Sequence, residues 1–310
     1  IWDGTLYAGT VYDGAYISRD GGDTWEAASS EPGVLYPLTL LKDSRDGTLY
    51  AGTIIGVYRS RDGGSTWESA SAGLTDIEVG PVVQDSRDNT LYVGSCGGVY
   101  KSQDDGYSWQ VTSGGLTRAC VWALLMDREN GVLYAGTDSG ILRSRDGGDT
   151  WEVADTGLPE RAEVSSLLQD NRDGTLYAGT HGDGIFRSRN AGDTWEAASA
   201  GLKSDFIDIL FQDAWDDTLY AKTSYGYFRS IDYGETWKRL PDAYEYRLLP
   251  DWLISKEMHF PLKTFGGYQI YNQPSEAVKT VKYYYSWYAT IMEVQVEPHT
   301  PPRRDLFWAL

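Results

Sequence analysis

Three arginines have a residue type and spacing that could form a binding site for a carboxylate. Arg118 and Arg161 occupy equivalent positions between repeats of the sequence, and Arg247 could join them. Three guanidinium groups on one face would bind a carboxylate bidentately. Because arginines between repeats are commonly surface residues, we favour a solvated role for them. A glycoside hydrolase needs two carboxylates about 5–10 Å apart, but the chain has 45 acidic residues. We therefore assign no catalytic residue.

The sequence also gives little support for a metal or cofactor site. Its three histidines, His181, His259 and His299, show no ligand spacing. The acidic turns lack the ligand density of a calcium loop. The Gly-Gly pairs precede strands and not helices, so they do not fit a phosphate-binding loop. We predict no metal and no cofactor.

The elements that must position any site are built from a repeated octet, Ser-x-Asp-x-Gly-x-Thr-Trp. Its closing tryptophans are 42, 42, 42, 44 and 42 residues apart. The octets occupy residues 18–25, 60–67, 102–109, 144–151, 188–195 and 230–237. A period of this length with strand-like content is typical of propellers and solenoids.

Each octet is expected to form a hairpin turn. Its Asp can accept backbone N–H bonds, and its glycines supply left-handed conformations. Its Trp is large enough to wedge between neighbouring sheets. A basic residue also recurs at one strand position, at Arg59, Lys101, Arg143, Arg187 and Arg229. Because an enzyme needs its acid once and not six times, recurrence favours a structural role for both sets.

The remainder of each repeat predicts four short strands. An apolar first strand ends in an Asp, a turn follows, and a second strand reads Leu-Tyr-Ala-Gly-Thr, as in Leu6–Thr10 and Leu49–Thr53. The third strand leads into the octet, and the fourth begins after its Trp. A four-stranded unit repeated radially is a propeller blade. The sequence therefore predicts an all-β fold.

We predict a seven-bladed β-propeller of four-stranded antiparallel blades, with six clear repeats and one degenerate repeat at residues 260–279. The chain begins at a second strand, so residues 288–297 are expected to pair beside Leu6–Thr10 and close the first blade. This closure would protect strand edges. The propeller then spans 1–297, and 298–310 form a C-terminal tail. Six or eight blades remain alternatives.

The composition of the chain limits the classes of partner that it can bind. A net charge of −18 argues against nucleic acid, and no apolar stretch reaches the ~18 residues of a spanning helix. Because the chain starts at Ile1, an export signal cannot be seen. Cys96 and Cys120 lie in neighbouring repeats. A disulfide between them requires a Cα separation below ~7 Å, and we favour two free, partly buried thiols.

The octets resemble the Asp-box (bacterial neuraminidase) repeat, strongly over about residues 1–240 and weakly over 241–297. This resemblance implies a β-propeller like those of sialidases, xyloglucanase-type glycosidases, sortilin-like receptors and photosystem II assembly factors, and a secreted or periplasmic location. Sialidases carry an Arg-Ile-Pro element near the N-terminus, an arginine triad and a Tyr–Glu pair. The most similar segment of this chain is Arg247-Leu248-Leu249-Pro250, which lies in its C-terminal part and not near the N-terminus.

Differences between the repeats mark the predicted binding surface. The connections between second and third strands, and those between repeats, lie at one end of each blade, which we call the loop face. There we predict ligand-binding residues at Tyr12, Asp13, Tyr36, Glu78, Arg118, Trp122, Asp138, Arg161, Glu163, His181, Asp183, Asp208 and Tyr225. Aromatics mixed with acids suit a protein or polysaccharide. We predict a non-catalytic binding or assembly module, with an exo-acting glycoside hydrolase as the alternative; the oligomeric state stays open.

Overall fold

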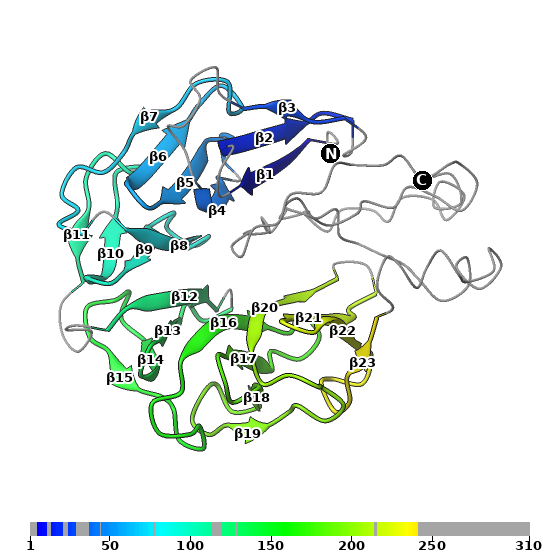
Figure 1. Cartoon of the computed structure of the whole chain (residues 1–310). Coiled ribbons are helices and arrows are strands. Elements are labelled where there is room, and N and C mark those ends of the chain that lie inside the picture. Colours follow the sequence, from blue (N-terminus) through cyan, green and yellow to red (C-terminus); the bar gives the residue numbers. More distant parts are fainter. Residues whose placement is uncertain are drawn as a thin grey trace. The chain divides into compact units, whose positions relative to one another are not determined.

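The described part of the chain is built from β-strands arranged in six sheets (Figure 1). A computed structural model describes residues 5–10, 14–20, 24–28, 37–43, 45–76, 78–112, 119–127, 129–213 and 216–240. One sheet has three strands and five have four. The protein is therefore an all-β propeller with six blades in its described part. Within those residues we find no helix long and apolar enough to cross a membrane.

Each sheet follows the chain order predicted for a blade. The first three sheets contain β1 (Leu6–Thr10), β2 (Gly14–Ser18) and β3 (Glu26–Ala27); β4 (Pro37–Lys42), β5 (Leu49–Thr53), β6 (Gly56–Ser60) and β7 (Glu68–Ser69); and β8 (Val79–Gln84), β9 (Leu91–Ser95), β10 (Gly98–Ser102) and β11 (Gln110–Val111). The other three contain β12 (Val121–Met126), β13 (Leu133–Thr137), β14 (Gly140–Ser144) and β15 (Glu152–Val153); β16 (Val164–Gln169), β17 (Leu176–Thr180), β18 (Ile185–Ser188) and β19 (Glu196–Ala197); and β20 (Ile207–Gln212), β21 (Leu219–Thr223), β22 (Gly226–Ser230) and β23 (Lys238–Arg239).

The chain divides into two compact units. The first comprises residues 1–51, 60–68 and 241–310, and the second comprises 52–59 and 69–240. The four sheets from β8 to β23 lie in the second unit. The predicted seventh blade (260–279), the closing strand (288–297) and the tail (298–310) lie outside the described residues, so the count of seven blades stays a prediction.

The Leu-Tyr-Ala-Gly-Thr strand is the central support of each blade. All five residues of β13 and of β17 are buried. Their Gly is needed because the first strand of the next sheet packs directly on it. A Cβ at Gly136 would lie 2.7 Å from Val164 Cγ1, and one at Gly179 would lie 2.6 Å from Ile207 Cγ2. This motif thus fixes how closely successive blades of the second unit approach.

The octet Asp has the structural role predicted for it. Asp62 Oδ1 accepts hydrogen bonds from Ser60 Oγ and from the Thr66 amide, both at 2.8 Å, and its Oδ2 accepts one from Thr66 Oγ1 at 2.6 Å. Asp104, Asp146 and Asp232 accept the same three bonds in their own octets. These carboxylates are therefore committed to their turns.

The octet Trp wedges between blades, as predicted, in most of the second unit. Trp195 is buried and donates from Nε1 to Ala154 O in the preceding blade at 2.8 Å. Trp109 and Trp237 make equivalent bonds to Ala70 O and Ala198 O. Trp67 differs: it is only partly buried, and its Nε1 donates to Gly64 O within its own hairpin.

Recurring Arg and Tyr side chains join each blade to the octet of the next. Arg143 Nη1 and Tyr134 Oη both donate to Ala191 O, at 2.7 and 3.0 Å. Arg187 and Tyr177 both donate to Tyr233 O in the same way. Burial raises the pKa of Tyr134 to about 12, so its hydroxyl remains a donor. The structural role predicted for the basic position is confirmed at Arg143 and Arg187.

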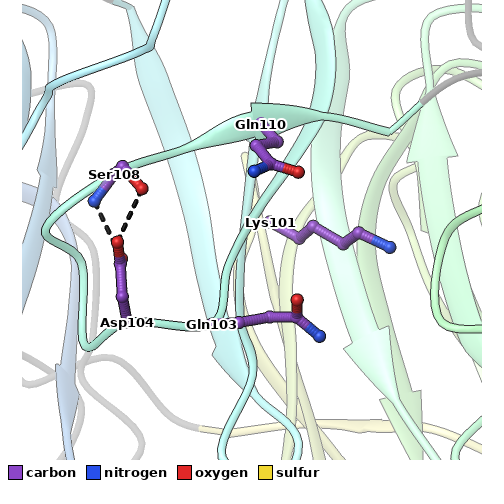
Figure 2. A pocket seen from close by; sticks show the side chains of 5 residues that line it. All are labelled: Lys101, Gln103, Asp104, Ser108 and Gln110. Atoms are coloured by element: carbon purple, nitrogen blue, oxygen red, sulfur yellow. Dashed lines mark hydrogen bonds between the residues drawn. The ribbon is translucent and has the colours of Figure 1, made fainter.

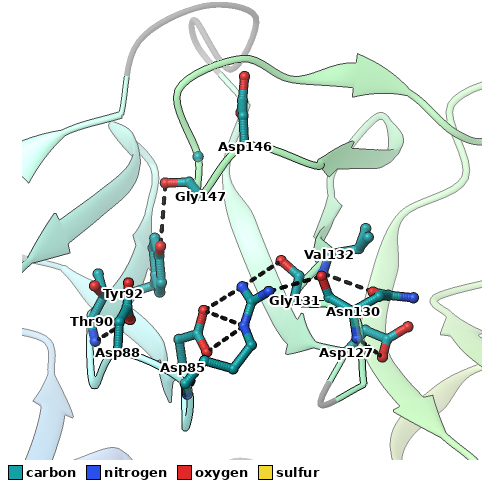
Figure 3. Close-up of polar contacts among 12 residues, drawn as sticks. Asp85, Asp88, Thr90, Tyr92, Asp127, Asn130, Gly131, Val132, Asp146 and Gly147 are labelled. Carbon is teal, nitrogen blue, oxygen red and sulfur yellow. Dashed lines mark hydrogen bonds and ion pairs between the residues drawn. The ribbon is translucent and has the colours of Figure 1, made fainter.

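Figure 3 shows this junction between the β8–β11 and β12–β15 sheets. Tyr92 Oη donates to Gly147 O at 3.3 Å. Arg87 forms an ion pair with the buried carboxylate of Asp85 and donates to Asn130 O in the next blade at 2.9 Å. The Asp that ends a first strand therefore orients an arginine that holds the neighbouring turn.

The expectation of free thiols is wrong, because Cys96 and Cys120 form a disulfide. The close approach of neighbouring blades explains the bond. A Cβ at Gly94 would lie 2.6 Å from Val121 Cγ1, and each cysteine lies within two residues of this contact. The Cα atoms of the cysteines are 3.7 Å apart, well within the limit that we set from the sequence.

The octet carboxylates predict a loss of stability in acid. Hydrogen bonds from Thr66 lower the pKa of Asp62 from 3.8 to about 2, and those from Thr150 do the same for Asp146. Because the folded-state pKa lies below the unfolded one, this stabilisation is complete above about pH 4 and is lost as the pH falls through about 2. The double variant Asp62→Asn/Asp146→Asn should lose stability less steeply over that range in denaturant titrations.

The chain itself shows that this variant can fold. Asn190 occupies the Asp position of one octet, and its Oδ1 accepts bonds from Ser188 Oγ and the Thr194 amide. An identical pH profile in the wild type and the double variant would show that these carboxylates do not contribute to acid unfolding. The matched variant Asp62→Ala/Asp146→Ala should be destabilised at every pH.

Candidate functional site

Nine of the predicted site residues lie in the described part of the second unit. They are Glu78, Trp122, Asp138, Arg161, Glu163, His181, Asp183, Asp208 and Tyr225. The other four, Tyr12, Asp13, Tyr36 and Arg118, lie outside the described residues. Arg247 is also outside them, so the arginine triad is not tested; Arg161 itself is exposed, with φ at 61°.

Two of the predicted residues sit on β-bulges of first strands. The register of β12 against β13 shifts between Val121 and Ala123, so Trp122 is the extra residue. The register of β20 against β21 shifts between Ile207 and Ile209, so Asp208 is the extra residue there. Bulges re-aim side chains and are frequent beside functional sites. Trp122 is 45% exposed, so its indole is available to a partner.

Asp208 lies near an unexpected cation. Lys222 Nζ is 3.5 Å from Asp208 Oδ2, and Lys222 is buried. It replaces the Gly of the Leu-Tyr-Ala-Gly-Thr motif, so the break in that motif was the signal that could have found it. Ser165, at the matching bulge of β16, instead donates to Ile207 O at 2.5 Å and supports the next strand.

The structure brings Glu163 and His181 together. His181 Nδ1 lies 3.1 Å from Glu163 Oε1, and the two side chains are 37% and 44% exposed. The His181 ring is also tilted against Phe206, with centroids 6.3 Å apart. Phe206 is 56% exposed and was absent from the predicted site, although its position varies between repeats. We call Glu163, His181 and Phe206 the β16–β20 cluster.

An enlarged connection positions this cluster. Residues 181–184 connect β17 to β18, and this loop is longer than its counterpart between β13 and β14. His181 N donates to Glu163 O, while Gly182 N and Gly184 N both donate to Asp205 O, each at 2.9 Å. The loop is thus tied by its backbone to the entry strands of two blades. Because the loop is already fixed, its side chains lose little conformational entropy when a partner binds.

The remaining predicted residues are exposed. Asp138 N donates to Cys120 O at 3.2 Å, which places it beside the disulfide. Glu78 precedes β8, Asp183 lies in the enlarged loop, and Tyr225, in the β21–β22 turn, is 62% exposed. Among the described residues, no side-chain hydrogen bond or ion pair joins these four residues to the β16–β20 cluster.

Two pockets formed by described residues lie at octets and not on the loop face. One has a volume of about 100 Å³ and is lined by Lys101, Gln103, Asp104, Ser108 and Gln110 (Figure 2). Ser108 donates both of its bonds there to Asp104 within the turn. The described residues also contain no group of three or more His, Cys, Asp and Glu side chains placed to hold a metal ion.

The fold and the octets define the class of protein. The family profile of the BNR/Asp-box repeat matches residues 16–27, and the same octet recurs in the other blades. The protein is therefore a β-propeller built on BNR/Asp-box repeats. No curated protein matched the sequence.

Solved structures with similar folds have different functions. The GH74 xyloglucanase from Xanthomonas campestris is 18% identical, with a TM-score of 0.61 over 75% of this chain and 45% of the enzyme. The extracellular domain of a putative one component system from B. thetaiotaomicron is 19% identical, with a TM-score of 0.60 over 73% of this chain and 31% of that one. YCF48 bound to D1 peptide is 18% identical, with a TM-score of 0.53 over 74% and 76%.

These likenesses establish the fold alone. The chain spans less than half the length of the xyloglucanase and of the extracellular domain. Because one propeller fold serves many functions, the function of this protein must be argued from its own residues.

Proposed function

We propose that this protein is a non-catalytic binding or assembly module whose loop face engages a protein or polysaccharide partner. The observation that carries the proposal is a difference between the two ends of each blade: side chains at one end hold the fold together, and large rings at the other end are exposed. At the octet end, Asp, Arg, Tyr and Trp side chains are bonded to their own turn or to a neighbouring blade. At the loop face, Trp122, Phe206 and Tyr225 are large exposed rings. Tyr107 and Tyr233 are exposed rings of the octet end, but an arginine of the preceding blade lies over each of them. Aromatics of this kind dominate binding energy at interfaces.

The disulfide supports a location outside the cytoplasm. Disulfides persist in oxidising compartments and are rare in reducing ones. The Cys96–Cys120 bond and the likeness to an extracellular domain both fit a secreted or periplasmic protein. A disulfide beside Trp122 would also hold the binding surface in one conformation.

An exo-acting glycoside hydrolase is the second candidate, and the likeness to GH74 enzymes favours it. A hydrolase of this kind would need two carboxylates flanking the scissile bond. Purified protein incubated with xyloglucan should release no new reducing ends. If it does, and if Glu163→Gln or Asp208→Asn abolishes the release, the hydrolase becomes the better proposal.

Removing two exposed rings tests the binding proposal directly. Trp122→Ala/Tyr225→Ala should weaken binding to a partner by about tenfold or more, because each ring is an interface anchor. The measurement is interferometry against a panel of immobilised polysaccharides and synthetic peptides. The control Val153→Ala/Ile231→Ala removes two exposed apolar side chains from β15 and the last described octet. Equal binding by both variants would contradict the proposal.

A further inference from the structure

The charges of the loop face are unbalanced. In the second unit, the described connections of this face are residues 54–55, 70–76, 78, 96–97, 112, 119–120, 138–139, 154–163, 181–184, 198–206 and 224–225. They contain eight carboxylates and two Lys or Arg side chains, Arg161 and Lys203. The carboxylates are Asp76, Glu78, Asp138, Asp155, Glu160, Glu163, Asp183 and Asp205.

The octet end is acidic as well, but several of its carboxylates are paired with arginines. There Glu152 binds Arg143 and Arg145, and Glu235 binds Arg187 and Arg189. Among the described residues of the loop-face connections, the ion pair present is the one between His181 and Glu163. Several octet-end carboxylates are therefore paired with arginines, whereas seven of the eight loop-face carboxylates form no ion pair within the described residues.

Apolar side chains are exposed among these carboxylates. Ile54, Ile55, Trp122, Phe206 and Tyr225 are each more than 40% exposed, and all lie at the loop face of the second unit. An apolar surface with acids around it fits a partner that brings both apolar and cationic groups. Complementary charge also steers association and selects the partner.

We infer that the loop face takes an extended, cationic protein segment, and that the β16–β20 cluster receives one of its arginine or lysine side chains. This inference rests on the proposed function and specifies its partner. The cluster already shows the required arrangement: an imidazole nitrogen contacts the carboxylate of Glu163, and the same ring lies against Phe206. A guanidinium group combines these contacts, since it bonds carboxylates and stacks on aromatic rings.

The test uses fluorescent peptides of opposite charge. The first alternates arginine with leucine, the second alternates glutamate with leucine, and xyloglucan oligosaccharide serves as a neutral probe. The arginine peptide should bind most tightly, and its affinity should fall as salt is added. The variant Glu163→Gln/Asp205→Asn should weaken that binding by about threefold to tenfold, and Phe206→Ala should weaken it as well.

A matched variant separates a site from general attraction to an acidic protein. Glu129→Gln/Asp105→Asn also removes two exposed carboxylates, but from the octet end, and it should change the affinity less than about twofold. Equal losses in the two double variants, or failure of the arginine peptide to bind, would overturn the inference. Thermal unfolding of each variant should match the wild type, which shows that the fold is intact.

The outcomes also distinguish this inference from the proposed function. If xyloglucan or the glutamate peptide binds better, and Trp122→Ala/Tyr225→Ala abolishes that binding, the loop face is a binding site but its partner is not cationic. If no loop-face variant changes the binding of any probe, both the proposed function and the inference are wrong.

Discussion

Trp195→Ala should lower the free energy of unfolding by ~3–5 kcal/mol, the range for truncating a buried aromatic side chain. Trp195 is 5% exposed and packs in the cluster that joins the β12–β15 and β16–β19 sheets. The substitution removes its indole bond to Ala154 O and leaves a cavity between the two blades. Guanidinium titration followed by circular dichroism measures the change.

Trp67→Ala is the matched control, because it makes the same substitution at the same octet position. Trp67 is only partly buried, and its indole donates to Gly64 O within its own hairpin. We therefore expect a distinctly smaller loss. Equal losses in the two variants would show that the bond to the preceding blade contributes nothing beyond the local turn.

Loss of the disulfide should have the next largest effect. Cys96→Ser/Cys120→Ser should destabilise the protein by about 3 kcal/mol, the value expected when a cross-link over 24 residues is removed from the unfolded chain. Thermal unfolding without reductant measures this loss. Added reductant should destabilise the wild type by a similar amount and leave the double variant unchanged. A reductant effect of equal size in both proteins would contradict a role for this bond.

The sequence was sufficient to predict the blades because each local signal agreed with the others. The Asp-Gly turns, the buried Leu-Tyr-Ala-Gly-Thr strand and the Trp all indicate the same hairpins, and agreement of this kind makes a sequence specify one fold. Six blades and the octet hydrogen bonds were predicted in this way. The seventh blade depended on a decayed octet, at Tyr271 to Val278, and it remains a prediction.

The site was harder to predict, because its geometry depends on contacts between repeats. Variation between repeats identified Trp122 and Asp208, but the bulges that carry them become visible only when the strand register is known. The Glu163–His181 pair joins side chains 18 residues apart, through a loop whose backbone is bonded to the next blade. Phe206 lies at a position that varies between repeats, but its exposure could not be read from the sequence. The disulfide was misjudged because the close packing of Val121 on Gly94 was not anticipated.

The bulge in the first strand has a consequence for how such a protein can change. The extra residue has no partner across the ladder, so its side chain can be exchanged without shifting the register of the strand. Trp122, Ser165 and Asp208 show three different outcomes at this position in successive blades. If the loop face binds as proposed, its specificity can change by point substitution at a bulge without altering the hydrogen bonds that join the blades at the octet end. A library randomised at Trp122, whose side chain is exposed, should yield folded proteins with altered binding.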